Sequence, residues 1–337
     1  MLKDKIKIII IGCGVIADFH VNALQSIKDV QILGVYDANE EKCKVFAEKY
    51  AIDAFYSIED VWNSDCDMVA ICTPSGTHAT LAISAMNAGK NVAVEKPLAL
   101  NYEDCLKVVD TAEKNKKLCA PISQLRFSSS VLAVKKAVDN GLLGKMAIVD
   151  LSMKYFRSDA YYNGSWRGTF AMDGGGALMN QGIHGLDVMR FICGDVVEVQ
   201  GVVKTIVHDI EVEDTAVANI VFKNGALGTV CGTTSIRPGY PRRMEICGSK
   251  GSIVMEEDTV LKADVDGFEF ENSTSMAGGF SDPTAIASDG HKKQYLNIVS
   301  ALKGETPLAY TSRDASETVK LITAIYESSK QGKPIKL

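Results

Sequence analysis

The pattern of apolar and polar residues changes part-way along the chain. Up to about residue 122, short apolar runs at 5–11, 30–36, 67–72, 91–94 and 118–122 alternate with stretches of helical periodicity at 18–27, 40–49, 77–88 and 102–116. Buried strands that alternate with amphipathic helices are typical of a parallel sheet with crossover helices. Asn39 and Asn101 precede two of the helices and are predicted to cap them. Residues 1–122 are therefore predicted to form an α/β domain.

Beyond residue 145 the predicted strands are longer and follow one another directly. They span 146–156, 196–207, 213–222, 226–235, 242–248 and 251–255, with a hairpin turn at Asn224-Gly225. Two helices, at about 290–303 and 313–329, end the chain and are predicted to pack on this sheet or back on the first domain. Residues 273–290, rich in Ser, Gly and Asp, predict a loop. Residues 123–337 are thus predicted to form an α+β domain with a large, mostly antiparallel open sheet.

Composition narrows the class of protein. The 337 residues are 46% hydrophobic and 23% charged, which is typical of a globular protein with two domains. The net charge is −6, and the sequence has no long basic run of the kind that binds nucleic acid. No apolar stretch is long enough for a membrane helix or an export signal. The nine cysteines are scattered and form no Cys-x-x-Cys pair, which favours reduced thiols. We therefore expect a cytoplasmic protein with neither nucleic-acid nor membrane partners.

The first strand leads directly into a glycine-rich turn. The sequence after Ile11 is Gly12-Cys13-Gly14-Val15-Ile16-Ala17, and a second apolar run ends at Asp37, about 20 residues further on. In such a unit the first Gly permits the turn, the second lets a pyrophosphate approach the backbone, and a small third residue lets helix and strand pack closely. The phosphates meet the helix N-terminus, while a carboxylate at Asp37 binds the adenosine ribose and repels a 2′-phosphate. We predict a Rossmann domain that binds NAD in preference to NADP.

Polar residues follow two further strands of the predicted parallel sheet. Ligands of such sheets bind outside the carboxyl ends of the strands, so these residues are candidates for a site. The two clusters are Cys72-Thr73-Pro74 with His78, and Glu95-Lys96-Pro97. Lys96 is the catalytic candidate, because an ammonium beside a nicotinamide is partly desolvated and its pKa moves towards a value useful for proton exchange. His78 is predicted to shape the nicotinamide edge; an ordinary surface lysine at position 96 is the alternative.

A second candidate segment runs from Asp173 to Asp187, beginning with three glycines and continuing as a helix. Asn180, His184 and Asp187 are spaced i, i+4 and i+7, which predicts an amide, an imidazole and a carboxylate on one helix face. Imidazole as a group titrates near neutral pH, so His184 suits the removal of a proton from a carbinol while a hydride leaves for nicotinamide. Asp173, His184 and Asp187 are also metal-ligand types, but no Cys or second His joins them, and we predict no metal site.

Together these motifs resemble the Gfo/Idh/MocA family of oxidoreductases over essentially the whole chain. Gly12, Gly14, Ala17 and Asp37 match its dinucleotide site, Glu95-Lys96-Pro97 matches its strand-end signature, and residues 174–187 match its substrate-side helix. The resemblance implies NAD(P)-dependent oxidation or reduction of a ring hydroxyl in a sugar, cyclitol or related polyol. It also implies a homodimer or homotetramer that associates through the large sheet.

The resemblance further implies roles for particular residues. The cofactor site would comprise Gly12, Cys13, Gly14, Val15, Ile16, Asp37, Cys72, Thr73, Pro74, His78, Glu95, Lys96, Trp166 and Arg167. The substrate site would comprise Lys96, Arg167, Asn180, His184, Arg243 and His291, with Lys96 and His184 as the proton-handling pair. Arg237 and Arg242 join Arg243 and His291 as candidates for contact with hydroxyls or a carboxylate, since guanidinium groups suit planar anions.

One residue departs from the family pattern. Many members carry Asp at the position of Asn180, and an amide can neither act as a base nor raise the pKa of Lys96. We expect Asn180 to position a sugar hydroxyl while Lys96 and His184 share the proton transfers. Some relatives that act on nucleotide-linked amino-sugar acids show a similar Asn, so that substrate class stays open. A glycosidase or epimerase working by transient oxidation with bound NAD, and a non-catalytic NAD-binding sensor, are the alternative functions.

Overall fold

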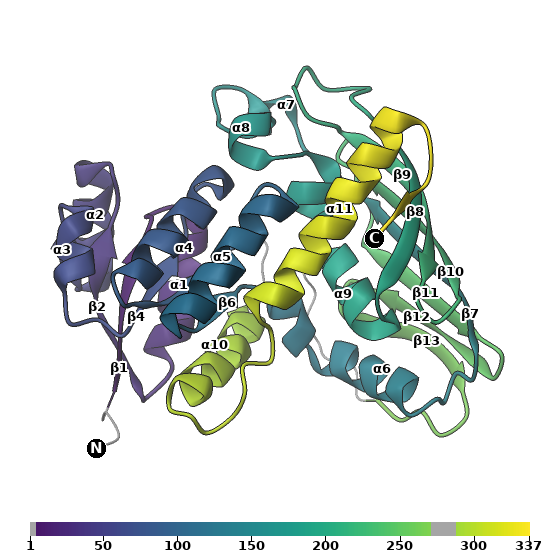
Figure 1. Cartoon of the computed structure of the whole chain (residues 1–337), viewed down its shortest axis with the longest axis horizontal. Helices are drawn as coiled ribbons and strands as arrows, with labels where there is room; N and C mark the ends of the chain where they lie inside the picture. The colour runs from purple at the N-terminus through teal and green to yellow at the C-terminus, as the bar shows by residue number, and fades with distance from the viewer. Residues whose placement is uncertain (1–4, 271–287) are drawn as a thin grey trace. The chain divides into compact units, whose positions relative to one another are not determined.

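The computed structural model describes residues 5–270 and 288–337 (Figure 1). Its contacts group the chain into two compact units, one of residues 1–124 and 288–316 and the other of residues 125–287 and 317–337. The sequence had assigned residues 288–316 to the second domain, with the last helices free to pack back on the first; the contacts group these residues with the first unit. Part of the loop predicted over 273–290 lies outside the described residues.

The first unit is built on a six-stranded parallel sheet with the order β3-β2-β1-β4-β5-β6. The strands are β1 (Ile6–Ile11), β2 (Val30–Tyr36), β3 (Asp53–Phe55), β4 (Met68–Ile71), β5 (Asn91–Val94) and β6 (Cys119–Pro121). The strands β1 to β3 follow one another in one direction across the sheet, and β4 to β6 follow one another in the other direction. The strand order therefore reverses between the neighbouring strands β1 and β4. In doubly wound sheets this switch point opens a crevice at the carboxyl ends of the strands, where ligands bind. The predicted Rossmann fold is confirmed.

The helices that connect these strands are α1 (Val15–Gln25), α2 (Glu40–Tyr50), α3 (Ile58–Asn63), α4 (His78–Asn87) and α5 (Tyr102–Asn115), with a 3₁₀ turn at Ser75–Thr77. The unit also contains α10 (Ser288–Leu302). Both predicted caps are confirmed, because the Oδ1 atoms of Asn39 and Asn101 accept hydrogen bonds from the backbone N–H groups of Lys42 and Asp104. The short elements α3 and β3 were not predicted.

Helix α10 comes from the far end of the chain but belongs to the core of the first unit. It packs on α1, and Tyr295 and Ile298 are fully buried in one hydrophobic cluster with Ala17, Val21 and strand β1. Burial of that many apolar side chains is the main stabilising contribution to such a unit. The first unit is therefore complete only with residues 288–316.

The second unit is built on an eight-stranded sheet with the order β13-β12-β11-β7-β10-β9-β8-β14. The strands are β7 (Met146–Lys154), β8 (Val196–Lys204), β9 (Thr215–Phe222), β10 (Leu227–Thr233), β11 (Arg243–Gly248), β12 (Gly251–Glu256), β13 (Thr259–Val265) and β14 (Ile335–Lys336). All neighbouring pairs are antiparallel except β7 with β10. The predicted α+β domain with a mostly antiparallel sheet is confirmed, although β13 and β14 were missed.

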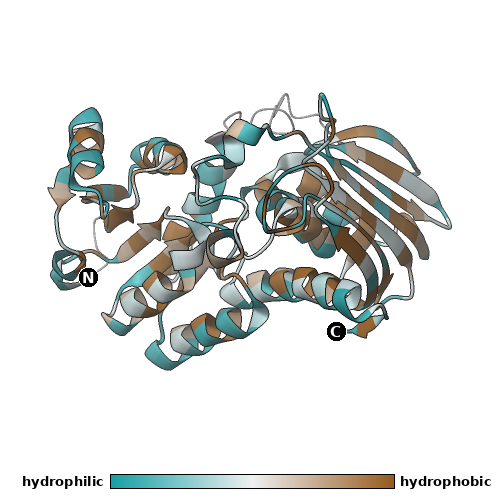
Figure 2. Ribbon diagram, turned by 90° about the horizontal axis from the view of Figure 1, so that it is seen from above, coloured by the Kyte–Doolittle hydropathy of each residue, from teal (hydrophilic) through white to brown (hydrophobic). Residues whose placement is uncertain are grey.

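One face of this sheet is covered by helices. The helices of the unit are α6 (Ser129–Asp139), α7 (Asp159–Tyr162), α8 (Phe170–Asp173), α9 (Ile183–Cys193) and the part of α11 (Ser312–Gln331) beyond residue 316. Residues alternate between buried and more exposed along β9, as expected for a sheet with one covered face. Figure 2 shows hydrophobic and hydrophilic positions interspersed along the strands of the large sheet. None of the described helices is both long and apolar enough to cross a membrane.

Candidate active site

The glycine turn after β1 has the geometry that the sequence predicts. Gly12 adopts φ +105°, and a Cβ atom there would lie 2.8 Å from the carbonyl carbon and oxygen of Cys72 at the end of β4. The Gly12 N–H donates to the carbonyl of Tyr36 at 2.7 Å. Only glycine fits this conformation and this close approach. The turn thus lies directly over the switch point of the sheet.

The N-terminus of α1 is open at this turn. Gly14 precedes the helix in an extended conformation, is exposed, and has no atom within 4 Å of the place where a Cβ would stand. Val15 is 60% exposed, whereas Ala17 is fully buried and lets the helix pack closely. The first N–H groups of a helix and its dipole favour an anion. The turn therefore fits the pyrophosphate of a dinucleotide.

Asp37 is fixed at the end of β2. Its Oδ2 atom accepts a hydrogen bond from the Cys13 N–H at 2.8 Å, and its Oδ1 atom accepts one from the Asn39 N–H at 2.8 Å. An ionised carboxylate has about four acceptor positions, so each oxygen keeps a lone pair for a ribose hydroxyl. The side chain is half-buried beside the glycine turn. This arrangement fits NAD and disfavours a 2′-phosphate.

His78 joins the loops that follow β4 and β5. Its Nδ1 atom lies 2.7 Å from the carbonyl oxygen of Pro97, and its Nε2 atom lies 2.8 Å from that of Thr73. The ring is buried, and burial lowers its pKa although both carbonyls favour the charged form. The imidazole therefore lies between the two loops, and it donates to one of the carbonyls when neutral and to both when charged.

Glu95 and Lys96 follow one another at the carboxyl end of β5. The Glu95 carboxylate is buried, and its Oε1 atom lies 2.9 Å from His20 Nε2, while its Oε2 atom accepts the Lys96 backbone N–H at 3.1 Å. The predicted contact of the Glu95 side chain with the cofactor is therefore wrong in this structure, because its carboxylate faces the core. Lys96 is half-buried at the carboxyl end of β5, where the sequence places it.

His291 was expected to contact the substrate, and the structure contradicts this. The side chain is completely buried in the first unit, between Phe19, His20 and Glu95. It lies on α10, whose packing on α1 removes it from solvent. His20, Glu95 and His291 form the one group of metal-ligand types that the described residues bring within 4.8 Å of one another.

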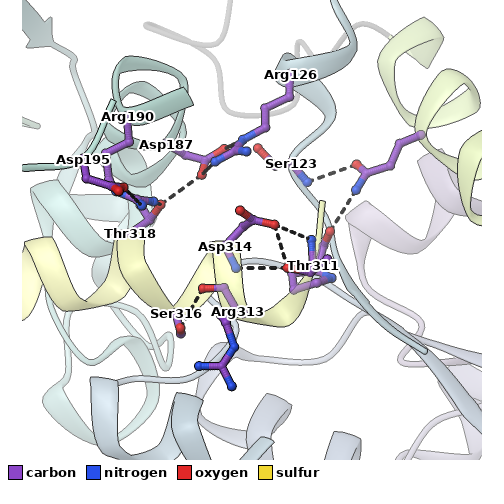
Figure 3. Close-up of polar contacts among 12 residues, drawn as sticks. Ser123, Arg126, Asp187, Arg190, Asp195, Thr311, Arg313, Asp314, Ser316 and Thr318 are labelled. Atoms are coloured by element: carbon purple, nitrogen blue, oxygen red, sulfur yellow. Dashed lines mark hydrogen bonds and ion pairs between the residues drawn. The ribbon is translucent and has the colours of Figure 1, made fainter. Parts of the chain in front are cut away.

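The substrate-side segment of the second unit contains a helical irregularity. Residues Ala177–Gly182 form a π-helical turn, and α9 begins only at Ile183. Asp187 is buried whereas Asn180 and His184 are half-buried, so Asp187 does not share an accessible face with them as predicted. Asp187 instead binds Arg126 through two hydrogen bonds of 2.7 Å and accepts the hydroxyl of Thr318 (Figure 3). Asp187 is therefore a structural ion pair in the core of the second unit.

Asn180 is hydrogen-bonded to the carboxylate of Asp173. Its Nδ2 atom donates to Asp173 Oδ1, and the other oxygen of the buried Asp173 accepts the Gly168 N–H at 2.6 Å. The Asn180 Oδ1 atom accepts from Gln181 Nε2 at 3.1 Å. The amide orientation is thus fixed by Asp173, and His184 follows half-buried in the first turn of α9.

Three residues that the sequence did not single out extend this network. Gln181 donates to the Tyr161 hydroxyl at 2.9 Å and accepts from Arg157 at 2.6 Å. The guanidinium carbon of Arg167 lies 4.6 Å from the centre of the Tyr161 ring and 5.0 Å from that of Trp166. The tyrosines that precede Trp166 in the sequence were the feature that could have indicated this network. A guanidinium held against aromatic faces keeps its hydrogen-bonding edge for an anion.

A buried glutamate supports the same segment. Glu213 accepts the backbone N–H groups of Gly176 at 2.7 Å and Leu178 at 2.9 Å, and the hydroxyl of Tyr326 at 2.9 Å. Burial raises its pKa against the opposing hydrogen bonds. Glu213 therefore anchors the start of the π-helical turn that carries Asn180. No sequence motif marked it.

The remaining predicted arginines already have partners. Arg243 binds Glu245 at 2.8 Å and Glu256 at 3.4 Å, so its predicted substrate contact has no support in the structure. Arg242 is buried near Glu257, and Arg237 lies over the ring of Phe156. In the structure Arg242 and Arg243 lie next to carboxylates and Arg237 next to an aromatic ring, and contacts of these arginines with a substrate stay a prediction.

Known proteins share both units. The family model described as "Oxidoreductase family, NAD-binding Rossmann fold" matches residues 6–122, and that of the GFO/IDH/MocA C-terminal domain matches residues 131–254. The chain belongs to the GFO/IDH/MocA family. The predicted resemblance is therefore confirmed.

Similar members of the family are dehydrogenases. Myo-inositol 2-dehydrogenase of Thermotoga maritima is 26% identical over 98% of both chains. A crystal structure of the WlbA dehydrogenase from Chromobacterium violaceum with NADH and UDP-GlcNAcA is 30% identical, has a TM-score of 0.89, and covers 100% of this chain and 97% of its own. The corresponding WlbA complex from Bordetella pertussis is 27% identical, with a TM-score of 0.89, and covers 100% and 99%.

Family membership and the geometry of the turn agree on the cofactor and the reaction class. The protein is an NAD-dependent oxidoreductase of the sugar and cyclitol dehydrogenases, and NAD is its cofactor. The cradle at Gly12, the open N-terminus of α1 and the carboxylate of Asp37 fit that cofactor. The Thermotoga relative is named for an inositol, and the two WlbA structures hold UDP-GlcNAcA.

Proposed function

We propose that the protein oxidises a ring hydroxyl of a nucleotide-linked sugar acid. The observation that carries this proposal is the full-length similarity to the two WlbA dehydrogenases, whose structures hold NADH and UDP-GlcNAcA. Two features of this chain support it. Asn180 holds an amide in a fixed orientation, and Arg167 offers a guanidinium edge that suits a carboxylate.

Lys96 and His184 would share the proton transfers. Bound NAD accepts a hydride from the carbinol carbon at nicotinamide C4. The hydroxyl proton of the same carbinol must leave at that moment, and an amine or an imidazole close to the hydroxyl can accept it. Lys96 lies in the first unit and His184 in the second.

The outer face of the large sheet would form a homodimer or homotetramer. Its exposed hydrophobic residues include neighbours across strands, namely Val202 beside Val217 and Ile148 beside Leu227. Exposed apolar clusters of this kind mark interaction surfaces. All nine cysteines are free thiols, which favours a reducing compartment, and we place the protein in the cytoplasm.

Formation of NADH with a panel of substrates tests the proposal. Purified protein with NAD is mixed with UDP-linked uronic acids, free uronic acids, inositols and aldoses, and the absorbance of NADH is recorded. We expect a rise with the UDP-linked acids. A rise with inositols alone would instead favour the activity named for the Thermotoga relative. NAD that stays bound without net NADH would favour transient oxidation.

A further inference from the structure

A chain of hydrogen bonds runs from α10 to the backbone of Lys96. The Tyr295 hydroxyl lies 2.6 Å from His20 Nδ1, and His20 Nε2 lies 2.9 Å from Glu95 Oε1. The other oxygen of Glu95 accepts the Lys96 N–H at 3.1 Å. All three side chains belong to the first unit and are buried. We call Tyr295, His20 and Glu95 the relay.

The protonation states of the relay follow from its surroundings. Burial alone raises the pKa of Glu95, but the hydrogen bond from His20, with the imidazole of His291 beside it, outweighs burial and holds that pKa well below its usual value. Burial lowers the pKa of His20 and raises that of Tyr295. Glu95 is then an acceptor only, so neutral His20 donates from Nε2 and accepts the Tyr295 hydroxyl at Nδ1. Every polar atom along the relay has a partner.

A metal ion is the competing interpretation of this cluster. His20, Glu95 and His291 are ligand types, and neither ring nitrogen of His291 has a hydrogen-bond partner. However, both nitrogens of His20 are already engaged at hydrogen-bond distances, and Glu95 and His20 bind each other directly. His291 Nε2 is 3.8 Å from Glu95 Oε1. The geometry favours a hydrogen-bond relay over a coordination sphere.

We propose that Tyr295, His20 and Glu95 are positioning residues that hold Lys96 in place for proton transfer, and that α10 thereby supports the active site. This inference rests on the proposed catalytic role of Lys96. Catalytic groups have to be held closely in position by buried supporting contacts, and a small misplacement is costly. Glu95 is the residue next to Lys96, and its two oxygens join that backbone to helices α1 and α10. Loss of any one hydrogen bond of the relay is therefore expected to change the position of Lys96.

Labelling of Lys96 tests the relay without any substrate. The full-length protein is compared as the unaltered form, Y295F, and Y50F, and the rate at which acetic anhydride modifies Lys96 is followed by mass spectrometry. Tyr50 is the matched control in the same unit, since its hydroxyl donates to Asp18 at 2.6 Å. We expect Y295F to change the Lys96 rate severalfold and Y50F to leave it unaltered. Equal rates in all three forms would overturn the proposal.

Kinetics with the substrate identified by the NADH assay give a second test. One lost hydrogen bond of ordinary strength predicts a fall of about tenfold in kcat for Y295F, with KM and the affinity for NADH unchanged. If the residues act as one unit, the double variant Y295F/E95Q loses no more activity than E95Q alone. Additive losses would overturn the relay, as would one equivalent of bound metal that E95Q removes. A failed substrate panel would count against the proposed function and leave the labelling result standing.

Discussion

Each unit buries one glutamate behind a segment of the candidate active site, and the two have opposite electrostatics. Glu95 and Glu213 are both 6% exposed. Glu95 has histidines as neighbours, and its pKa is held well below the usual value although burial opposes this. Glu213 binds two backbone N–H groups and a tyrosine hydroxyl, and burial raises its pKa. Equal burial therefore does not set the charge of a carboxyl group; its partners do.

The comparison has a functional side, because each glutamate supports a different catalytic candidate. Glu95 holds the backbone of Lys96, and Glu213 holds the turn that leads to Asn180 and His184. In both cases the support ends on a helix late in the chain, since Tyr295 lies on α10 and Tyr326 on α11. In each unit, a helix that is distant in sequence from the catalytic candidate thus supports the glutamate next to that candidate's segment.

The largest fall in kcat is expected when the catalytic candidate of the second unit, His184, loses its side chain. The substitution H184A should lower kcat by about 10²–10⁴-fold, the usual contribution of a general acid or base. Binding of NADH, followed by quenching of protein fluorescence, should be unchanged, because the dinucleotide turn lies in the first unit. An unaltered kcat would show that the segment anchored by Glu213 carries no proton-transfer group.

The next test compares the two glutamates directly. E95Q should reduce the free energy of unfolding by about 2 kcal/mol, because it removes a buried charge-assisted hydrogen bond and places an amide against the His20 donor. E213Q should cost less, about 1 kcal/mol, since loss of the poorly solvated charge offsets the mismatched amide. Urea unfolding at neutral pH measures both. Equal losses would show that the histidines near Glu95 do not matter.

The pH dependence of stability should separate the two sites by sign. The depressed pKa of Glu95 stabilises the fold above the unfolded value of 4.5, and this contribution is lost as pH falls from about 4.5 through the folded pKa. The raised pKa of Glu213 acts oppositely: its contribution is present below 4.5 and is lost as pH rises through the folded value. In urea titrations from neutral to acid pH, E95Q should therefore flatten the acid loss and E213Q should steepen it. The same change of slope in both variants would contradict these directions.

The sequence predicted the first unit better than the second because its signals are local. Gly12, Asp37 and the caps at Asn39 and Asn101 act within a few residues of their position in the chain, and the structure has all of them in place. The long strands of the second sheet were also recognised from their alternation. Such features need no knowledge of what lies across the fold.

The residues that sequence reasoning missed depend on distant partners. Glu213 meets Tyr326 across more than a hundred positions, and His291 enters the first unit from the other end of the chain. A π-helical turn cannot be told from an α-helix by hydrophobic spacing, and the ion pair with Arg126 that buries Asp187 leaves no local signal either. Contacts of this kind depend on the tertiary fold and leave no periodic pattern in the sequence.

The smallest predicted effect is at the far end of the Glu213 anchor. Y326F removes one hydroxyl from Glu213 but leaves both backbone N–H groups in place, so the π-helical turn should keep its conformation. Loss of one of the three hydrogen bonds to this carboxyl group should cost about 1 kcal/mol of the free energy of unfolding, and kcat should change less than in Y295F. Urea unfolding and steady-state kinetics of the two Tyr-to-Phe variants measure the difference. If Y326F proved the more damaging to kcat, the anchor in the second unit, rather than the relay in the first, would be the support that limits catalysis.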